Sequence, residues 1–258
     1  MKYFLSLMLF FVLMSFAPQK PASYDVGEWL KFRIHYGFVD AGIATIEVSE
    51  SVKDNKKVYH AIGKGYTIGI SRLFFKVDDN YESYFDKLTN KPYQFVRKID
   101  EGGYVKNQEG FFDQTSNKVI VKDYKNNKET TVSVSENVQD IVSSFYYLRN
   151  HPNVDRLKPG ESIMIDMFFD NEVFKFKLKF IGKENIKTKF GTAPTLIFRP
   201  IVQSGRVFKE DESLTVWISD DENKIPLRIK AELMVGSLKA DLDGFKGLKN
   251  PFMVKLKN

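Results

Sequence analysis

The sequence predicts a mainly β fold: a large curved antiparallel sheet, half-barrel or barrel-like, with one central amphipathic helix packed on its concave side. Apolar and polar residues alternate with a period of two along much of the chain, as in strands with one buried face. Short polar clusters separate these stretches, and short turns join antiparallel strands, since parallel strands need long crossovers. Only residues 138–149 show clear helical spacing.

The predicted strands differ in how clearly they alternate. At 174–180, aromatic residues and a leucine take one side and lysines take the other, and 30–36 and 227–233 follow the same pattern. The more mixed strands are 44–48, 58–62, 93–99, 119–124, 163–169, 196–202, 214–218 and 238–242. Residues 70–75 fit either one or two helical turns or the start of a strand, and both assignments stay open.

The helical stretch has Ile141, Phe145 and Leu148 at i, i+4 and i+7. Asn137 is the expected N-cap, and a His-Pro pair ends the helix, because the residue before proline avoids the α region. The apolar face is too wide for an exposed helix. We therefore expect the helix of 138–149 to pack against the concave side of the sheet.

Residues 1–17 have the pattern of a signal peptide, with an apolar run followed by small residues. Pro18 disfavours a cut directly after residue 17, so cleavage near Ala22 is an alternative. The run is shorter than the about 20 apolar residues that span a bilayer, and a retained N-terminal anchor is the other interpretation. We expect an exported protein, located in the periplasm.

Residues 18–258 are expected to form a single β-rich domain, with 150–160 as the place where it could divide. One sheet curled around the helix is the preferred arrangement, and two packed β halves are the alternative. No second hydrophobic stretch follows residues 1–17, so we expect no transmembrane segment after signal cleavage.

Composition excludes several classes of protein. The chain has no cysteine, and therefore no disulfide, thiolate metal site or acylated lipobox cysteine. Its net charge is +6, and +5 without residues 1–17, where Lys2 is the only charged residue. Because lysines alternate with acidic residues instead of gathering on one face, we expect no nucleic-acid partner.

The densest acidic cluster is a candidate for ligand binding. Its members are Asp78, Asp79, Glu82 and Asp86. In a strand, all of these except Asp79 would share one face. The start of the cluster resembles a calcium loop, but Ser83 and Thr89 stand where that loop needs glycine and glutamate. A carboxylate pair would suit glycoside hydrolysis, whereas the simpler interpretation is a solvated strand face.

No catalytic or metal motif is recognisable elsewhere, so we name no catalytic residue and expect no metal and no cofactor. His35, His60 and His151 lack a second ligand at metal-binding spacing. There is no nucleophile elbow, and the glycines within 63–69 do not form a phosphate-binding fingerprint.

Aromatic residues are abundant, with 23 Phe, 12 Tyr and 2 Trp. On the inner face of a curled sheet, such rings either fill a core or line an apolar cavity. A half-barrel interior suits a lipid-like or other apolar ligand. The pattern does not distinguish a filled interior from a hollow one.

Several stretches carry a family resemblance: 24–32 (YDVGEWLKF), 75–84 (FKVDDNYESY) and 216–221 (VWISDD). With shorter pieces such as Ile225-Pro226, they resemble the domain of unknown function 3108 family over nearly the whole mature chain. The resemblance implies an exported envelope protein of Gram-negative bacteria with an antiparallel curved sheet. It implies no established activity and no catalytic residues.

The hairpin at 217–221 and the helix on a curved sheet also resemble, at the level of fold, the periplasmic lipoprotein carriers. Those carriers hold acyl chains in a half-barrel. Trp217 and Asp220 are therefore further candidates for ligand binding.

Together these features favour a non-enzymatic protein of the periplasm or envelope that binds an apolar or amphipathic ligand, or an envelope protein. A contiguous apolar cavity would support this function. One alternative is an envelope glycan hydrolase, which needs two of the acidic residues in one cleft about 5–10 Å apart. Another is a structural component of an envelope assembly, which needs an uncovered apolar patch or sheet edge. Ligand identity and oligomeric state do not follow from the sequence.

Overall fold

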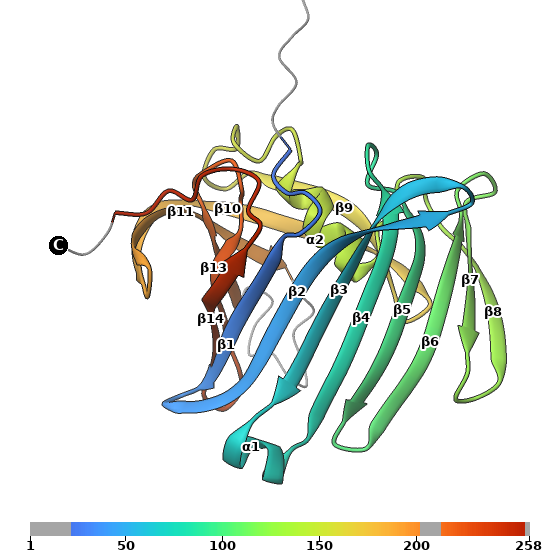
Figure 1. Cartoon of the computed structure of the whole chain (residues 1–258), viewed down its shortest axis with the longest axis horizontal. Helices are drawn as coiled ribbons and strands as arrows, with labels where there is room; N and C mark the ends of the chain where they lie inside the picture. Colours follow the sequence, from blue (N-terminus) through green and yellow to red (C-terminus); the bar gives the residue numbers. More distant parts are fainter. Residues whose placement is uncertain (1–21, 202–212, 256–258) are drawn as a thin grey trace, which may run out of the picture.

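The structure, a computed structural model, describes residues 22–201 and 213–255, and the expected signal peptide lies outside the described residues. All named strands belong to one antiparallel 14-stranded sheet, in the order β8-β7-β6-β5-β4-β3-β2-β1-β14-β13-β12-β11-β10-β9. The sheet curls without closing, with α2 on its concave side (Figure 1). The predicted curved antiparallel sheet with one central helix is confirmed, and the alternative of two packed halves is wrong.

Two meanders meet where β1 pairs with β14. The first consists of β1 (Trp29–Tyr36), β2 (Val39–Lys53), β3 (Lys56–Thr67), α1 (Gly69–Phe74), β4 (Val77–Asp86), β5 (Pro92–Glu101), β6 (Tyr104–Asp113), β7 (Lys118–Asp123) and β8 (Lys128–Ser133). The second consists of α2 (Ile141–Arg149), β9 (Ser162–Phe169), β10 (Glu172–Thr188), β11 (Gly191–Ile201), β12 (Leu214–Ser219), β13 (Pro226–Glu232) and β14 (Ser237–Lys246).

Alternation did not predict β6 and β8 as strands, and for the acidic cluster in β4 a strand was considered only as one interpretation. β8 has the sequence KETTVS, in which only one residue is strongly apolar, so its alternation is weak. It forms because its backbone N–H and C=O groups pair with β7 along its whole length. Residues 70–75, left open between helix and strand, contain most of the short helix α1.

α2 begins three residues later than predicted because a different residue caps it. Asp140 accepts hydrogen bonds from the backbone N–H groups of Val142 and Ser143, both at 2.8 Å. The Ser143 hydroxyl accepts a bond from the Asp140 N–H at 2.9 Å, which completes a capping box. The prediction that Asn137 caps this helix is wrong, because Asn137 adopts a left-handed backbone with φ of 63°.

The two edges of the sheet overlap instead of joining. Gln139, just before α2, forms a parallel bridge with Met167 on the free edge of β9. The neighbouring Phe168 packs against Phe95 and Phe112, with ring centroids 5.9 and 6.0 Å apart. Because successive side chains alternate along a strand, Phe168 leaves β9 on the side opposite Met167. The outer side of β9 therefore lies against the inner side of β5 and β6.

A buried ion pair ties together the end of the sheet that carries α2, called the α2 end below. The side chains of Arg149 and Glu28 are 4% and 0% exposed and share two hydrogen bonds of 2.6 and 2.7 Å. Arg149 also donates to the carbonyl oxygens of Ser23 at 3.0 Å and Asn223 at 2.9 Å. This network joins the N-terminal segment, α2 and the β12–β13 turn.

Candidate functional site

An apolar cavity of about 230 Å³ lies between α2 and the inner face of the second meander. Its principal lining residues are Phe145, Leu148, Phe176, Leu178, Val216 and Ile229. They come from α2, β10, β12 and β13, so the cavity is built from segments that the sequence separates by up to about 80 residues. This is the strongest candidate for a ligand-binding site.

Strand register places the lining side chains on one face. Leu178 pairs with Pro200, and Phe198 pairs with Val216, which in turn pairs with Ile229. Side chains directly opposite each other on antiparallel strands point to the same side of the sheet. Leu178, Val216 and Ile229 face the interior and yet stay only half-buried. The interior of the half-barrel is therefore hollow at this point.

Two charged side chains line the cavity among the described residues, Arg149 and Lys224, and both are paired with carboxylates of the protein itself. Arg149 is bound to Glu28, as described above, and the buried Lys224 forms an ion pair with Asp155 at 2.9 Å. The Lys224 ammonium also contacts the carbonyl oxygen of Asp221. With these charges paired, the remaining cavity wall favours an apolar ligand over an ionic one.

A group of charged interior residues lies on the inner face of the first meander. Burial, followed by the neighbouring carboxyl group of Glu101, raises the pKa of Asp79 to about 6. Arg97 bonds to Asp170 in the β9–β10 turn at 2.5 Å, and Lys106 contacts the same carboxylate. The space beside Arg97 measures about 30 Å³, room for about one water molecule. These residues fasten the overlapping edges of the sheet.

The structure places Asp78 on the outer face of β4. Arg72 donates two hydrogen bonds to its carboxylate, at 2.8 and 2.7 Å, and this contact lowers the pKa of Asp78 to about 2. Glu82, also on the outer face, binds His60 and Asn80, each at 2.8 Å. Burial opposes ionisation of Glu82, but these two hydrogen bonds outweigh it and lower its pKa.

Asp86 serves the β4–β5 turn, because it accepts hydrogen bonds from the N–H groups of Leu88 and Thr89 at 2.9 and 2.8 Å. Of the four acidic candidates, Asp79 is the one that faces the interior. Asp78 and Glu82 share the outer face but stand four residues apart on a strand, about 13 Å at the usual rise. The acidic cluster therefore supplies no carboxylate pair in one cleft for glycoside hydrolysis.

Trp217 and Asp220 also lie away from the cavity. Val216 and Ile218 line it, so Trp217 between them points to the other side of β12. Its indole N–H donates to the carboxylate of Glu184. Asp220 forms an ion pair with Lys183 at 2.9 Å. Both candidates thus contact β10, through Glu184 and Lys183, and neither lines the cavity.

Of the residues that line the cavity, helical spacing had already placed Phe145 and Leu148 on the face of α2 expected to meet the sheet, but no strand residue of the lining was named as a site. The alternation at 174–180 and 227–233 does place Phe176 and Ile229 on apolar strand faces, which is a usable signal. Nothing in the chain indicates that these faces converge beneath α2, because that depends on strand order and register. The buried Arg149 gave no signal either, since a basic residue at a helix C-terminus is common on surfaces.

The continuous sheet that curls without closing, with a helix on its concave side, defines a half-barrel β protein. The chain belongs to the family described as "Protein of unknown function (DUF3108)", whose family model matches residues 31–243. The resemblance found in the sequence is thus confirmed. The family description assigns no activity.

Two solved structures that match this chain share little sequence with it. A beta-barrel-like protein of domain of unknown function DUF1849 from Brucella abortus is 8% identical, with a TM-score of 0.55, over 88% of this chain and 100% of that one. A DUF1089 family protein from Pseudomonas aeruginosa is 9% identical, with a TM-score of 0.35, over 70% and 87%. The first similarity supports the half-barrel fold alone. A comparison with curated proteins gave no match.

No helix within residues 22–201 and 213–255 is long and apolar enough to cross a membrane. Across the same ranges, no group of three or more His, Asp or Glu side chains is arranged to hold a metal ion.

Proposed function

We propose that this protein is exported to the periplasm and is a non-enzymatic carrier or sensor that holds an apolar or amphipathic molecule in the cavity beneath α2. The observation that carries this proposal is the hollow apolar interior. Inward-facing residues such as Leu178 and Val216 stay half-buried around a cavity of about 230 Å³. Half-buried apolar side chains on a concave face are what a ligand would cover.

The dimensions suit an acyl chain or another slender apolar group. An engineered apolar cavity of about 150 Å³ in another protein binds benzene, so this larger one has room for several methylene groups. Each buried methylene contributes about 0.8 kcal/mol. Because Arg149 and Lys224 already have carboxylate partners, a polar headgroup is expected to stay at the mouth of the cavity.

The first experiment is native mass spectrometry of the mature protein purified from its own cell envelope, followed by solvent extraction. A stoichiometric apolar molecule released on denaturation is the expected result. Binding is then measured by titration with cis-parinaric acid, a fluorescent fatty acid, in the delipidated protein. Absence of both a copurifying molecule and saturable binding of this probe would refute the proposal.

A matched pair of variants tests whether the cavity is the binding site. Val216→Trp fills it from β12, whereas Thr215→Trp adds the same ring to the opposite face of the same strand. We expect Val216→Trp to weaken probe binding at least tenfold and Thr215→Trp to leave it within twofold. Equal effects of the two substitutions would place the probe elsewhere.

A further inference from the structure

Large apolar side chains project from one end of the half-barrel, opposite α2. Phe38 in the β1–β2 turn is fully exposed, and Leu73 and Phe74 in α1 are each 84% exposed. Met234 and Val235 in the β13–β14 turn are 69% and 76% exposed. Ile70, Phe75 and Tyr104 are also exposed. These eight residues are called the α1 rim below.

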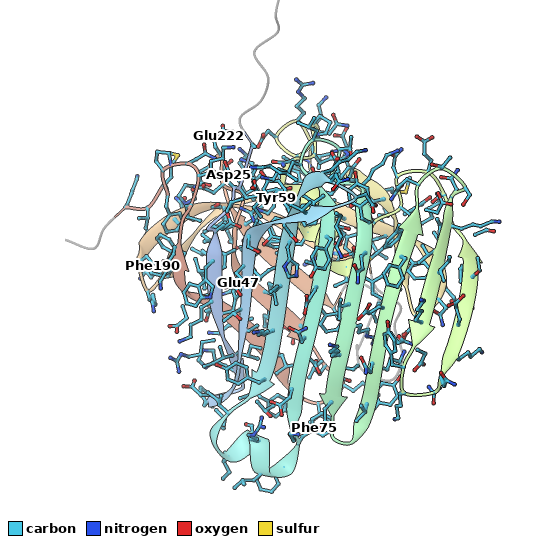
Figure 2. All side chains as sticks on the ribbon, turned by 45° about the vertical axis from the view of Figure 1, so that its right-hand side comes forward. Asp25, Glu47, Tyr59, Phe75, Phe190 and Glu222 are labelled. Carbon is cyan, nitrogen blue, oxygen red and sulfur yellow. The ribbon has the colours of Figure 1, made fainter. Side chains whose placement is uncertain are left out.

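The topology brings these turns together at one end. In an antiparallel meander, the turns that follow β1, β3 and β5 lie at the same end of the sheet. The pairing of Tyr36 with Leu238, between β1 and β14, brings the β13–β14 turn to this end as well. Figure 1 shows α1 at the lower end and α2 toward the upper end, and Figure 2 shows Phe75 at the lower end.

Contacts between neighbouring turns make the rim continuous. The Tyr36 hydroxyl donates to the carbonyl oxygen of Val235 at 2.9 Å, which joins the β1–β2 and β13–β14 turns. Ile68, just before α1, donates its N–H to Ala41 of β2 at 3.0 Å. On the other side, the ring of Phe75 lies over Gly102 in the β5–β6 turn. These contacts hold the turns that carry the exposed side chains next to one another at the α1 end of the sheet.

Charged groups close to α1 are bound to one another. Arg72 donates two hydrogen bonds to Asp78, and Lys76 forms ion pairs with Asp78 at 3.3 Å and Asp100 at 2.7 Å. Basic residues near the rim are thus balanced by carboxylates. A partner that recognises the rim is expected to do so through its apolar side chains and to show little dependence on salt.

We infer that the α1 rim inserts into the surface of a lipid bilayer. The side chains stand on the convex tips of separate turns, and a bilayer interface accepts projecting apolar groups without a complementary shape. A protein partner would need a matching set of pockets, since protein interfaces are closely packed. Aromatic side chains with polar ends, such as Tyr104, are favoured at the level of lipid headgroups. The hydrophobic α1 tip would enter deepest.

This surface goes beyond the proposed function and does not depend on it. Ligand binding involves the cavity beneath α2, whereas the rim is at the opposite end. The two hypotheses can fail separately. A protein that binds cis-parinaric acid but no vesicles would refute only the membrane insertion of the α1 rim. A protein that binds vesicles but not the fatty acid would refute only ligand binding in the cavity.

The test uses flotation of the mature protein with vesicles of phosphatidylcholine, alone or mixed with phosphatidylglycerol. We expect binding to both kinds of vesicle, changed less than threefold by raised salt. Leu73→Ser/Phe74→Ser should weaken binding at least tenfold. The control is Leu88→Ser, because Leu88 is 90% exposed in the β4–β5 turn at the α2 end. That variant should bind vesicles as the unmodified protein does.

A second readout reports insertion directly. Phe74→Trp places an indole at the tip of α1, and its fluorescence should shift to the blue and be quenched by brominated lipids. Three results would overturn the inference: no flotation of the unmodified protein, equal losses in the rim and Leu88 variants, or binding limited to anionic vesicles and abolished by salt. In vesicle-bound Phe74→Trp, an indole that stays fully water-exposed would likewise exclude insertion of α1.

Discussion

The two ends of the half-barrel use their side chains in opposite ways. At the α2 end, a buried ion pair between Arg149 and Glu28, with aromatic residues around it, ties together segments far apart in the chain. At the α1 end, Phe38, Leu73 and Phe74 are exposed and the charged groups pair at the surface. The difference indicates that contacts at the α2 end hold distant segments together, whereas the α1 end leaves large apolar side chains at the surface.

The largest expected effect is on stability, from breaking the ion pair at the α2 end. Arg149→Met leaves the Glu28 carboxylate buried without its partner, and such losses typically cost about 3–5 kcal/mol. Urea unfolding followed by circular dichroism measures the change in the free energy of unfolding. The double variant Glu28→Gln/Arg149→Met should recover part of the loss, because no buried charge then remains uncompensated.

The equivalent change at the α1 end is the matched comparison. Arg72→Met breaks the ion pair with Asp78, which is exposed on both sides. Exposed pairs contribute little, because water screens them and two long side chains must be ordered. If Arg72→Met destabilised the protein as much as Arg149→Met, the proposed division of roles between the two ends would be wrong.

A smaller effect on stability is expected from the cap of α2. Asp140→Ala removes the acceptor for the N–H groups of Val142 and Ser143, and leaves the hydroxyl of Ser83 without its 2.6 Å partner. Loss of an N-cap costs about 0.5–2 kcal/mol, and an unsatisfied buried hydroxyl adds to it. We expect a loss of about 2 kcal/mol in urea unfolding. Asp140→Asn retains an acceptor oxygen and should lose less; an equal loss would show that the cap is not the cause.

This cap also shows how far the sequence could predict the structure. Strong alternation at 174–180 and helical spacing near 141–148 were sufficient to predict β10 and α2, because local burial patterns determine them. The cap at Asp140 was missed because Ser83, which bonds to it, lies on a distant strand. Alternation put Asp79 and Asp78 on opposite faces, but only the fold shows which face is inside. The residues that line the cavity and the contacts between turns of the rim depend on strand register, which cannot be predicted from a local sequence pattern.

The carboxyl groups of Asp79 and Glu101 on the inner face predict a pH dependence of stability. This dependence differs from that of Asp78 on the outer face of β4. In the folded protein the pKa of Asp79 is about 6, above its ordinary 3.8, because of burial and Glu101. The folded state therefore holds this proton more tightly, and the contribution of Asp79 to stability falls as the pH rises from about 4 to about 6. As the pH rises across this range, the free energy of unfolding of Asp79→Asn should increase relative to that of the unmodified protein. The expected difference is about 1 kcal/mol, because Asp79 is partly exposed and solvent reduces the effect.

Asp78 on the outer face supplies the control of opposite sign. Its pKa of about 2 lies below the ordinary value, so its contribution is present above about pH 4 and is lost as the pH falls toward 2. Asp78→Asn should therefore flatten the acid side of the stability profile and leave the range from 4 to 6 unchanged. Urea unfolding at a series of pH values measures both profiles. Identical profiles for the two variants would contradict the assignment of Asp79 to the interior.

The smallest expected effect is the most informative about the α1 end. Leu73→Ser/Phe74→Ser should change the free energy of unfolding by less than about 0.5 kcal/mol per substitution, as surface substitutions usually do. Thermal and urea unfolding should match those of Leu88→Ser, whose side chain is equally exposed at the other end. A loss well above 1 kcal/mol would mean that these side chains help to hold the fold. A change near zero would show that the fold does not depend on these side chains, as the inferred contact of the α1 rim with a membrane requires.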